Sequence, residues 1–340
     1  MKLLIVTQVV DRTDPHLGFF HTWIEQFARE CELVTVICLK EGEHVLPQNV
    51  RVFSLGKEKG RASSIVYAWR FLKIIVRQRN TYDSVFVHMN PEYIILGGLF
   101  FKLWHKKVAL WYAHKSVTLK LKIAVFFSDY IFSVTKNSFG IKTPKLYAMG
   151  HGVDTELFVQ KVRTKSDTLR LVSVGRIAGS KHLKEMLPVV EELQRRGENP
   201  VLTIVGAAVT PAEQIYKTEL VSAIEKMGLS DAVIMYGGAA HRTLPQLFLS
   251  QDVFLNFGTT GNMDKAGFEP LASGLPLVTT NEAFEEILSP YGLYVKGNNP
   301  ASLADAVLRA KDMEMAPFVE YVRINHSLSN LVPNIIARLS

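Results

Sequence analysis

The sequence has 340 residues, of which 48% are hydrophobic and 21% are charged, and its net charge is +7. This length exceeds the usual size of one hydrophobic core and favours two domains. The composition excludes an intrinsically disordered chain and is that of a folded globular protein.

Apolar stretches and cysteines bear on where the protein works. Met1–Asp11 contains a short apolar run interrupted by polar residues, whereas a secretory signal needs an uninterrupted apolar core, so we expect a first strand there. The longest apolar stretch, Tyr93–Phe101, is far shorter than the roughly 20 residues that span a bilayer. Cys31 and Cys38 lack metal-ligand spacing and are expected as small core residues. These features predict a cytoplasmic protein, with the inner face of the membrane as one place of work.

The charge is unevenly distributed along the chain. Residues 1–150 contain 21 Lys and Arg against 11 Asp and Glu, a balance of +10, whereas residues 151–340 contain 18 against 21, a balance of −3. A basic N-terminal half suggests an anionic partner, such as a lipid surface, a phosphorylated acceptor or nucleic acid. A basic face that serves only solubility is the alternative.

The first half alternates apolar runs with helix-length segments. Six runs predict strands: Leu3–Val6, Val34–Leu39, Val50–Leu55, Val85–His88, Val108–Trp111 and Ile131–Val134. Four segments show three- and four-residue apolar spacing and predict helices: His21–Glu30, Ile65–Arg79, Glu92–Trp104 and Thr118–Phe127. This alternation is typical of a parallel sheet covered by helices.

The pattern restarts after a polar stretch, Gln160–Thr168. Further strands are predicted at Leu169–Val174, Val201–Val205, Val233–Tyr236, Val253–Phe257, Leu277–Thr279 and Leu293–Val295. We therefore predict an α/β protein with two tandem Rossmann-like, doubly wound domains over residues 1–155 and 156–320. Residues 321–340 are expected to form a helical segment that packs back on the first domain. A cleft between the two sets of strand carboxyl ends would hold ligands.

The turn Val174–His182 carries two cations, Arg176 and Lys181, between a strand and a helix. Backbone N–H groups and a partial positive charge point out of such a turn, so it suits a diphosphate. The glycine and lysine spacing is not that of a P-loop. A basic turn exposed to solvent is the alternative.

A glycine-rich loop runs from Phe257 into a short helix that contains Glu269. Glycines allow close backbone approach, and a carboxylate can accept hydrogen bonds from both vicinal hydroxyls of a ribose. The alternative role of Glu269 is to complement the helix dipole.

Three segments together resemble the retaining family 4 glycosyltransferases of GT-B fold (glycosyl transferases group 1). They are Gly267–Val278, the turn with Gly175, Arg176 and Lys181, and Gly150–Asp154 followed by Phe158. The resemblance covers nearly the whole chain and implies a retaining hexosyltransferase.

The resemblance also implies roles for individual residues. Arg176 and Lys181 would bind the donor diphosphate and Glu269 the ribose, with Tyr236 lining the base pocket or packing at a strand end. The loop would contact phosphate and donor sugar through Gly261, Asn262, Met263, Asp264 and Lys265. The family's first glutamate is replaced here by Gly261, and Asp264 could supply a carboxylate from a shifted position or form an ion pair with Lys265.

In the first half, Gly18 and His114 are the implied site residues. Gly18 opens the first long helix, where a glycine lets the backbone approach a phosphate or sugar, and His114 resembles the family histidine that contacts the transferring sugar. By topology His88, at the end of a strand, also points to the cleft, but we favour His114 over His88 as a site residue.

The sequence contains no Asp-x-Asp metal motif, so we expect a metal-independent enzyme that uses Arg176, Lys181 and helix N-termini on the leaving group and needs no cofactor. Three other functions are alternatives: a sugar-nucleotide epimerase of the same fold, a nicotinamide dehydrogenase, whose Gly-x-Gly-x-x-Gly fingerprint this sequence lacks, and a non-catalytic sugar-nucleotide-binding protein. The favoured donor is a UDP-sugar and the acceptor a glycan, with no nucleic acid partner.

Basic and large apolar residues alternate in Trp69–Arg79, Phe100–Lys107 and Lys115–Phe127. Helices of that kind can lie on an anionic leaflet, which suggests a lipid-linked or membrane-proximal acceptor. Ordinary amphipathic helices with apolar residues in the core would give the same pattern.

Overall fold

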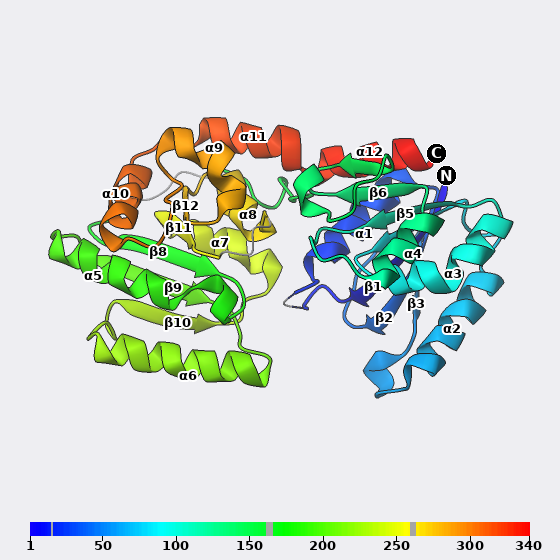
Figure 1. Cartoon of the computed structure of the whole chain (residues 1–340), viewed down its shortest axis with the longest axis horizontal. Coiled ribbons are helices and arrows are strands. Elements are labelled where there is room, and N and C mark those ends of the chain that lie inside the picture. The colour runs from blue at the N-terminus through cyan, green and yellow to red at the C-terminus, as the bar shows by residue number, and fades with distance from the viewer. Residues whose placement is uncertain (15, 161–165, 259–262) are drawn as a thin grey trace. The chain divides into compact units, whose positions relative to one another are not determined.

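The computed structural model describes residues 1–14, 16–160, 166–258 and 263–340. It divides the chain into two compact units (Figure 1). Unit 1 comprises Met1–Asp154 and Asn325–Ser340, and unit 2 comprises Thr155–Ile324. Among the described residues, no helix is both long enough and apolar enough to cross a bilayer.

Unit 1 contains a parallel sheet with the strand order β3-β2-β1-β4-β5-β6-β7. Its strands are β1 (Lys2–Val10), β2 (Leu33–Glu41), β3 (Val50–Ser54), β4 (Ser84–His88), β5 (Lys107–Trp111), β6 (Tyr130–Ser133) and β7 (Leu146–Ala148). Its helices are α1 (Phe19–Glu30), α2 (Ser64–Arg77), α3 (Pro91–Leu103), α4 (Leu119–Phe127) and α12 (Leu328–Leu339). The strand order reverses between β1 and β4, so unit 1 has a topological switch point there.

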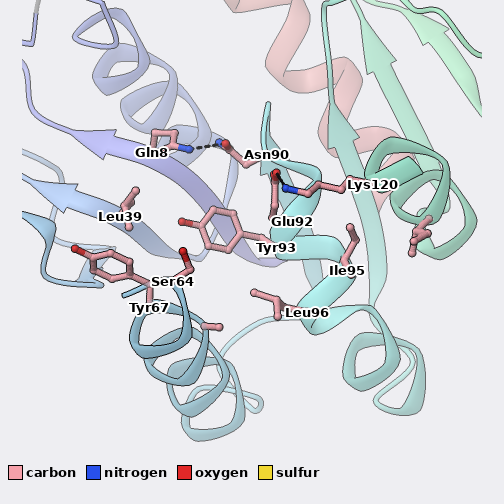
Figure 2. A pocket seen from close by; sticks show the side chains of 12 residues that line it. Gln8, Leu39, Ser64, Tyr67, Asn90, Glu92, Tyr93, Ile95, Leu96 and Lys120 are labelled. Carbon is pink, nitrogen blue, oxygen red and sulfur yellow. Dashed lines mark hydrogen bonds and ion pairs between the residues drawn. The ribbon is translucent and has the colours of Figure 1, made fainter. Parts of the chain in front are cut away.

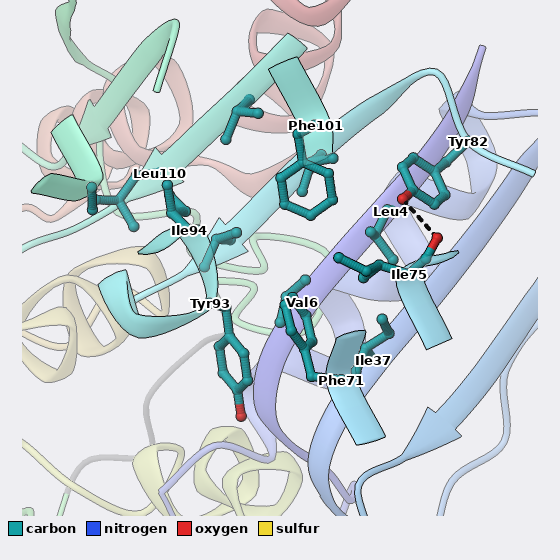
Figure 3. Close-up of a cluster of buried hydrophobic side chains, with 14 of the residues drawn as sticks. Leu4, Val6, Ile37, Phe71, Ile75, Tyr82, Tyr93, Ile94, Phe101 and Leu110 are labelled. Atoms are coloured by element: carbon teal, nitrogen blue, oxygen red, sulfur yellow. Dashed lines mark hydrogen bonds between the residues drawn. The ribbon is translucent and has the colours of Figure 1, made fainter. Parts of the chain in front are cut away.

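The two faces of this sheet are covered by different helices, because successive strand side chains point to opposite sides. On β4, Val85 and Val87 belong to a core that also contains Phe71 of α2 and Phe101 of α3 (Figure 3). Phe86, between them, packs against Phe27 of α1 with ring centroids 5.1 Å apart. Helices α2, α3 and α4 therefore cover one face and α1 the other.

The C-terminal residues join unit 1 through α12. The backbone N–H of Val153 donates to the carbonyl of His326, and that of Leu328 donates to the carbonyl of Val153. At the other end of α12, the Ser84 hydroxyl donates to the carbonyl of Leu339 at 2.8 Å. Helix α11 (Ala316–His326) leads into this segment and contains the last residues of unit 2.

Unit 2 contains a second parallel sheet with the order β10-β9-β8-β11-β12. Its strands are β8 (Leu169–Val174), β9 (Pro200–Val205), β10 (Val233–Gly237), β11 (Val253–Asn256) and β12 (Leu277–Thr279). Its helices include α5 (Leu187–Arg195), α6 (Pro211–Lys226), α7 (Leu244–Phe248), α8 (Lys265–Ala272), α9 (Glu285–Leu288) and α10 (Pro300–Lys311). The switch point lies between β8 and β11. The predicted α/β class with two parallel, helix-covered sheets is confirmed.

One predicted strand is absent from the described structure. Leu293–Val295 forms only an isolated bridge between Tyr294 and Thr279. Gly292, with φ of +67°, ends the preceding turn immediately before this segment, and Gly297, with φ of +82°, follows it closely. These turns leave too few extended residues for a strand.

Candidate active site

The carboxyl end of β8 begins the turn that carries the two predicted diphosphate cations. Gly175 donates to the carbonyl of Val205 at 2.9 Å, which holds the turn against the end of β9. A Cβ on Gly206 would lie 1.8 Å from the carbonyl oxygen of Gly175, so only glycine permits this approach. The turn then passes Arg176 and enters a 3-10 turn over Gly179–Lys181.

Arg176 is held by a carboxylate from the start of α6. Its Nη1 donates to Oε1 of Glu213 at 3.0 Å, while the guanidinium side chain remains 53% exposed. Glu213 also accepts the backbone N–H groups of Thr210 and Val209, as part of a capping box. These backbone hydrogen bonds, with the nearby Arg176 charge, hold the pKa of Glu213 below its ordinary value. Arg176 thus faces solvent beside Glu213, its partner within the described residues, and its remaining N–H groups can donate to an anion.

Lys181 lies against the start of α8. Its Nζ donates to Oδ2 of Asp264 at 2.6 Å, and both side chains are about four-fifths buried. A Cβ on Gly258 would lie 3.3 Å from the carbonyl oxygen of Ser180 and 3.7 Å from Oδ2 of Asp264. Gly258 therefore lets the segment after β11 pack beside the turn after β8. Asp264 thus has Lys181 as an ion-pair partner.

Glu269 lies within α8, and its side chain is only 7% exposed. Its Oε1 is 2.8 Å from Nε2 of His241, and Nζ of Lys265 lies 4.0 Å from the same oxygen. The His241 ring packs edge-on against Phe158, with centroids 5.3 Å apart. One oxygen of Glu269 is thus oriented by the protein, an arrangement suited to presenting a carboxylate to a polar ligand.

The remaining predicted donor residues of unit 2 vary in their surroundings. Tyr236 lies on β10 and is 56% exposed, so it is available to a ligand. Met263 is half-buried and precedes Asp264. Gly261 and Asn262 lie outside the described residues.

Unit 1 holds the two predicted first-half residues. A Cβ on Gly18 would lie 2.6 Å from the carbonyl oxygen of Asp14, so the start of α1 requires glycine for its own packing. His114 is exposed after β5, and its Nδ1 accepts the backbone N–H of Ser116 at 3.0 Å. Its Nε2 therefore carries the proton in the neutral ring and can donate to a sugar oxygen. His88 is buried, and its ring stacks on Phe20 with centroids 4.1 Å apart. That position gives His88 a packing role.

Two side chains that contact predicted site residues were not predicted from the sequence. Glu213 carries a signal, because Thr210-Pro-Ala-Glu213 is a capping-box pattern that fixes a carboxylate at a helix start. His241 lies in a short 3-10 turn after β10, and nothing in its local pattern indicates a contact with Glu269. In the described part of the chain, no group of three or more His, Cys, Asp and Glu residues could hold a metal ion.

These elements bring cations and oriented polar groups to one edge of the unit 2 sheet. Arg176 and Lys181 each have a carboxylate partner and further N–H donors, so each can bind an anion beside that carboxylate. A diphosphate near the turn and a hydroxylated group near Glu269 are the ligands that this chemistry suits.

The chain matches one protein family and is similar to several solved structures. Residues 154–323, half of the chain, match the family model described as glycosyl transferases group 1. No curated protein matches the chain. Among solved structures, Anabaena HepE in complex with UDP is similar, with a TM-score of 0.76, 15% identity, and coverage of 100% of this chain and 99% of that one.

Two other solved structures extend the range of similar proteins. Sucrose-phosphate synthase of Thermosynechococcus elongatus gives a TM-score of 0.72 at 13% identity, with 99% and 98% of the two chains covered. UDP-GlcNAc 2-epimerase of Methanocaldococcus jannaschii gives a TM-score of 0.62 at 15% identity, with 100% of this chain and 99% of that chain covered. At these identities the likeness shows the fold, and it confirms the predicted GT-B class.

Proposed function

We propose that this chain, which belongs to the family of glycosyl transferases group 1, transfers a hexose from a UDP-sugar to a lipid-linked acceptor with retention of configuration. The observation that carries the proposal is the convergence of Arg176, Lys181 and Glu269 at the carboxyl edge of one sheet. Family membership makes the reaction a glycosyl transfer, and the donor, acceptor and stereochemistry are our proposal.

In this proposal Arg176 and Lys181 receive the diphosphate of the donor. The C1–O bond of the sugar breaks, the electron pair stays on the diphosphate, and the two cations meet the growing charge. Each charge-assisted hydrogen bond contributes about 1.5–3 kcal/mol, so two that tighten in the transition state would give roughly 10²- to 10⁴-fold in rate. The sequence lacks an Asp-x-Asp motif, which favours this route without a metal ion.

Glu269 would accept the two ribose hydroxyls, with His241 fixing the orientation of the carboxylate. The segment Met263–Lys265 would face the phosphate and donor sugar, and Tyr236 would line the base pocket. The UDP in the similar HepE structure supports UDP as the nucleotide to test first.

On the acceptor side, His114 would donate from Nε2 to the transferring sugar, and Gly18 would leave room for the backbone to approach it. The acceptor hydroxyl attacks C1 and gives its proton to the departing phosphate, so no protein nucleophile is needed. Unit 1 contains 22 Lys and Arg against 12 Asp and Glu, a balance of +10, which supports an anionic acceptor.

A panel of sugar nucleotides screened by thermal shift identifies the donor, because binding to the native state raises Tm. Radiolabelled donor then tests the reaction. A glycosyltransferase releases UDP and free sugar slowly without acceptor and transfers the label when acceptor is present. A nucleotide-sugar epimerase, whose fold this chain shares, would instead interconvert sugar nucleotides. Epimerised donor without transfer would overturn the proposal.

A further inference from the structure

A pocket in unit 1 is lined by none of the residues proposed above for donor binding. It has a volume of about 620 Å³ and lies at the carboxyl ends of β1 and β2 and the start of α3, with Gln8, Leu39 and Asn90 at its rim (Figure 2). Through Gln8 of β1 and Asn90 after β4 the pocket borders the switch point of the unit 1 sheet, and open α/β sheets bind ligands at such points. Its volume falls within the roughly 300–1,000 Å³ of small-molecule pockets.

The walls of this pocket are largely apolar. Helix α2 contributes Tyr67 and Ala68, α3 contributes Ile95 and Leu96, and α4 contributes Ile123. Figure 2 shows Tyr67 and Leu96 on different helices that face the same space. An apolar group placed here would be removed from water, which favours its binding.

Four polar side chains of the pocket form two pairs. Nε2 of Gln8 donates to Oδ1 of Asn90 at 2.5 Å, and Nζ of Lys120 lies 3.1 Å from Oε1 of Glu92. Burial raises the pKa of Tyr93 to about 12, so its hydroxyl stays neutral. The pocket therefore offers an occupant mostly hydrocarbon, with polar groups at one side.

Apolar side chains continue outward from each wall. On α3, Leu99 and Leu103 follow Ile95 at four-residue spacing, and on α4, Leu119 and Phe126 flank Ile123. Phe126 is 67% exposed and Leu103 is 65% exposed, so both rows of apolar side chains end in solvent. Exposed apolar side chains gathered on neighbouring helices are typical of an interaction site.

Cations accompany these apolar side chains. Nζ of Lys102 lies 4.8 Å from the ring centroid of Phe126, and Nζ of Lys73 lies 4.7 Å from that of Trp69 on α2. Trp69 is itself 60% exposed. Exposed aromatic rings with ammonium groups beside them suit the boundary between acyl chains and anionic headgroups.

From these observations we propose that the pocket holds the apolar chain of an anionic, lipid-linked acceptor, with the surface of α2, α3 and α4 resting on the leaflet that supplies it. The inference builds on the proposed glycosyl transfer and names the chemical class of the acceptor: a long hydrocarbon or isoprenyl chain with a phosphate-bearing head. The positively charged lysines complement the phosphate-bearing head. The pocket and the apolar side chains beside it complement the hydrocarbon chain of the acceptor.

The test measures binding of farnesyl phosphate to the full chain by calorimetry, with isopentenyl phosphate and inorganic phosphate as head-group controls. We expect farnesyl phosphate to bind at least tenfold more tightly than either control. Ala68→Trp and, as a second variant, Leu96→Trp fill the pocket and should each weaken farnesyl phosphate binding at least tenfold. Ile215→Trp, on exposed α6 of unit 2, is the matched control and should bind like the unmodified chain.

Circular dichroism and UDP binding, measured on the same samples, separate the possible failures. A folded Ala68→Trp or Leu96→Trp that binds farnesyl phosphate normally overturns the pocket assignment, as does equal binding of all three phosphates. If the unmodified protein does not bind UDP, the proposed donor is contradicted, but the result for the pocket remains valid.

Discussion

Lys181 and Asp264 form an ion pair, 2.6 Å from Nζ to Oδ2, that joins the turn after β8 to the start of α8. The carboxylate of Asp264 partly neutralises Lys181 and so weakens its attraction for a diphosphate. Exposed ion pairs contribute about 0.2–1 kcal/mol, and desolvation offsets much of the stronger attraction in a partly buried pair such as this one. We therefore expect Asp264→Asn to tighten UDP binding up to about fivefold, and calorimetry at low and high salt measures it.

The same variant separates two roles of Asp264. If its carboxylate also takes the place of the missing family glutamate beside the donor sugar, transfer should fall at least tenfold while UDP binding does not weaken. Asp305→Asn, on exposed α10, is the control. Normal transfer with unchanged UDP affinity would leave Asp264 with neither role.

Removing either diphosphate cation should slow the reaction. Arg176→Ala and Lys181→Ala are each expected to lower kcat/KM at least tenfold, because each removes a charged hydrogen bond to the leaving group. Lys311→Ala breaks a comparable ion pair with Glu198 at a distance from the turn and should have normal kinetics. Near-normal kinetics in both Arg176→Ala and Lys181→Ala would remove the diphosphate assignment.

Glu269 is tested best by changing the ribose. The unmodified protein should bind UDP more tightly than 2′-deoxy-UDP, since the carboxylate loses one hydroxyl contact with the deoxy ligand. Glu269→Gln should weaken UDP binding several-fold and reduce that preference, and His241→Ala should do so to a smaller extent by freeing the carboxylate. If Glu269→Gln keeps the full preference for UDP over 2′-deoxy-UDP, Glu269 does not bind the ribose and only stabilises its helix.

Stability should depend on pH through His326, which is buried where α11 meets α12. Burial lowers the pKa of His326 to about 4, whereas an unfolded histidine titrates near 6.5. The unfolded state therefore binds the proton first as pH falls, and the contribution of His326 is complete above pH 6.5 and decreases below it. From pH 7 to pH 5 this contribution falls by about 2 kcal/mol.

Urea denaturation at the two pH values measures that change. His326→Gln, which cannot titrate, should be less stable at pH 7 but lose less stability between pH 7 and pH 5. His16→Gln, at an exposed position, should keep the pH dependence of the unmodified chain. Equal slopes for His326→Gln and the unmodified protein would assign the acid sensitivity to other groups.

The fold class was predictable because buried parallel strands are continuous apolar runs. Leu169–Val174 and Leu277–Thr279 are strands with the predicted bounds. β1 extends past its apolar run to Val10, because Val9 and Val10 pair with Lys40 and Glu41 of β2. That extension depends on a partner strand that the local pattern does not contain.

The contacts of the candidate site were less predictable than its positions. A strand-to-helix turn predicts that Arg176 and Lys181 lie at a sheet edge, but not that Glu213 and Asp264 pair with them, since those carboxylates come from 37 and 83 residues away. The unit 1 pocket depends on how α2, α3 and α4 pack on the sheet. Apolar periodicity identifies each helix but not the space left between them.

The basic and apolar surface of unit 1 should bind anionic membranes. Each cation near an anionic leaflet contributes about 1 kcal/mol, so the double variant Lys73→Gln, Lys102→Gln should weaken binding to anionic vesicles by about 2 kcal/mol, roughly thirtyfold. Replacing Trp69 and Phe126 by serine should remove the part of the binding that persists at high salt, since apolar insertion is not screened.

The control is Ile215→Ser on unit 2, where the charge balance is −3. Co-sedimentation with anionic and neutral vesicles at two salt concentrations separates these contributions. Equal, negligible binding of the unmodified protein to both vesicles would make the charge a solubility feature and favour a soluble acceptor.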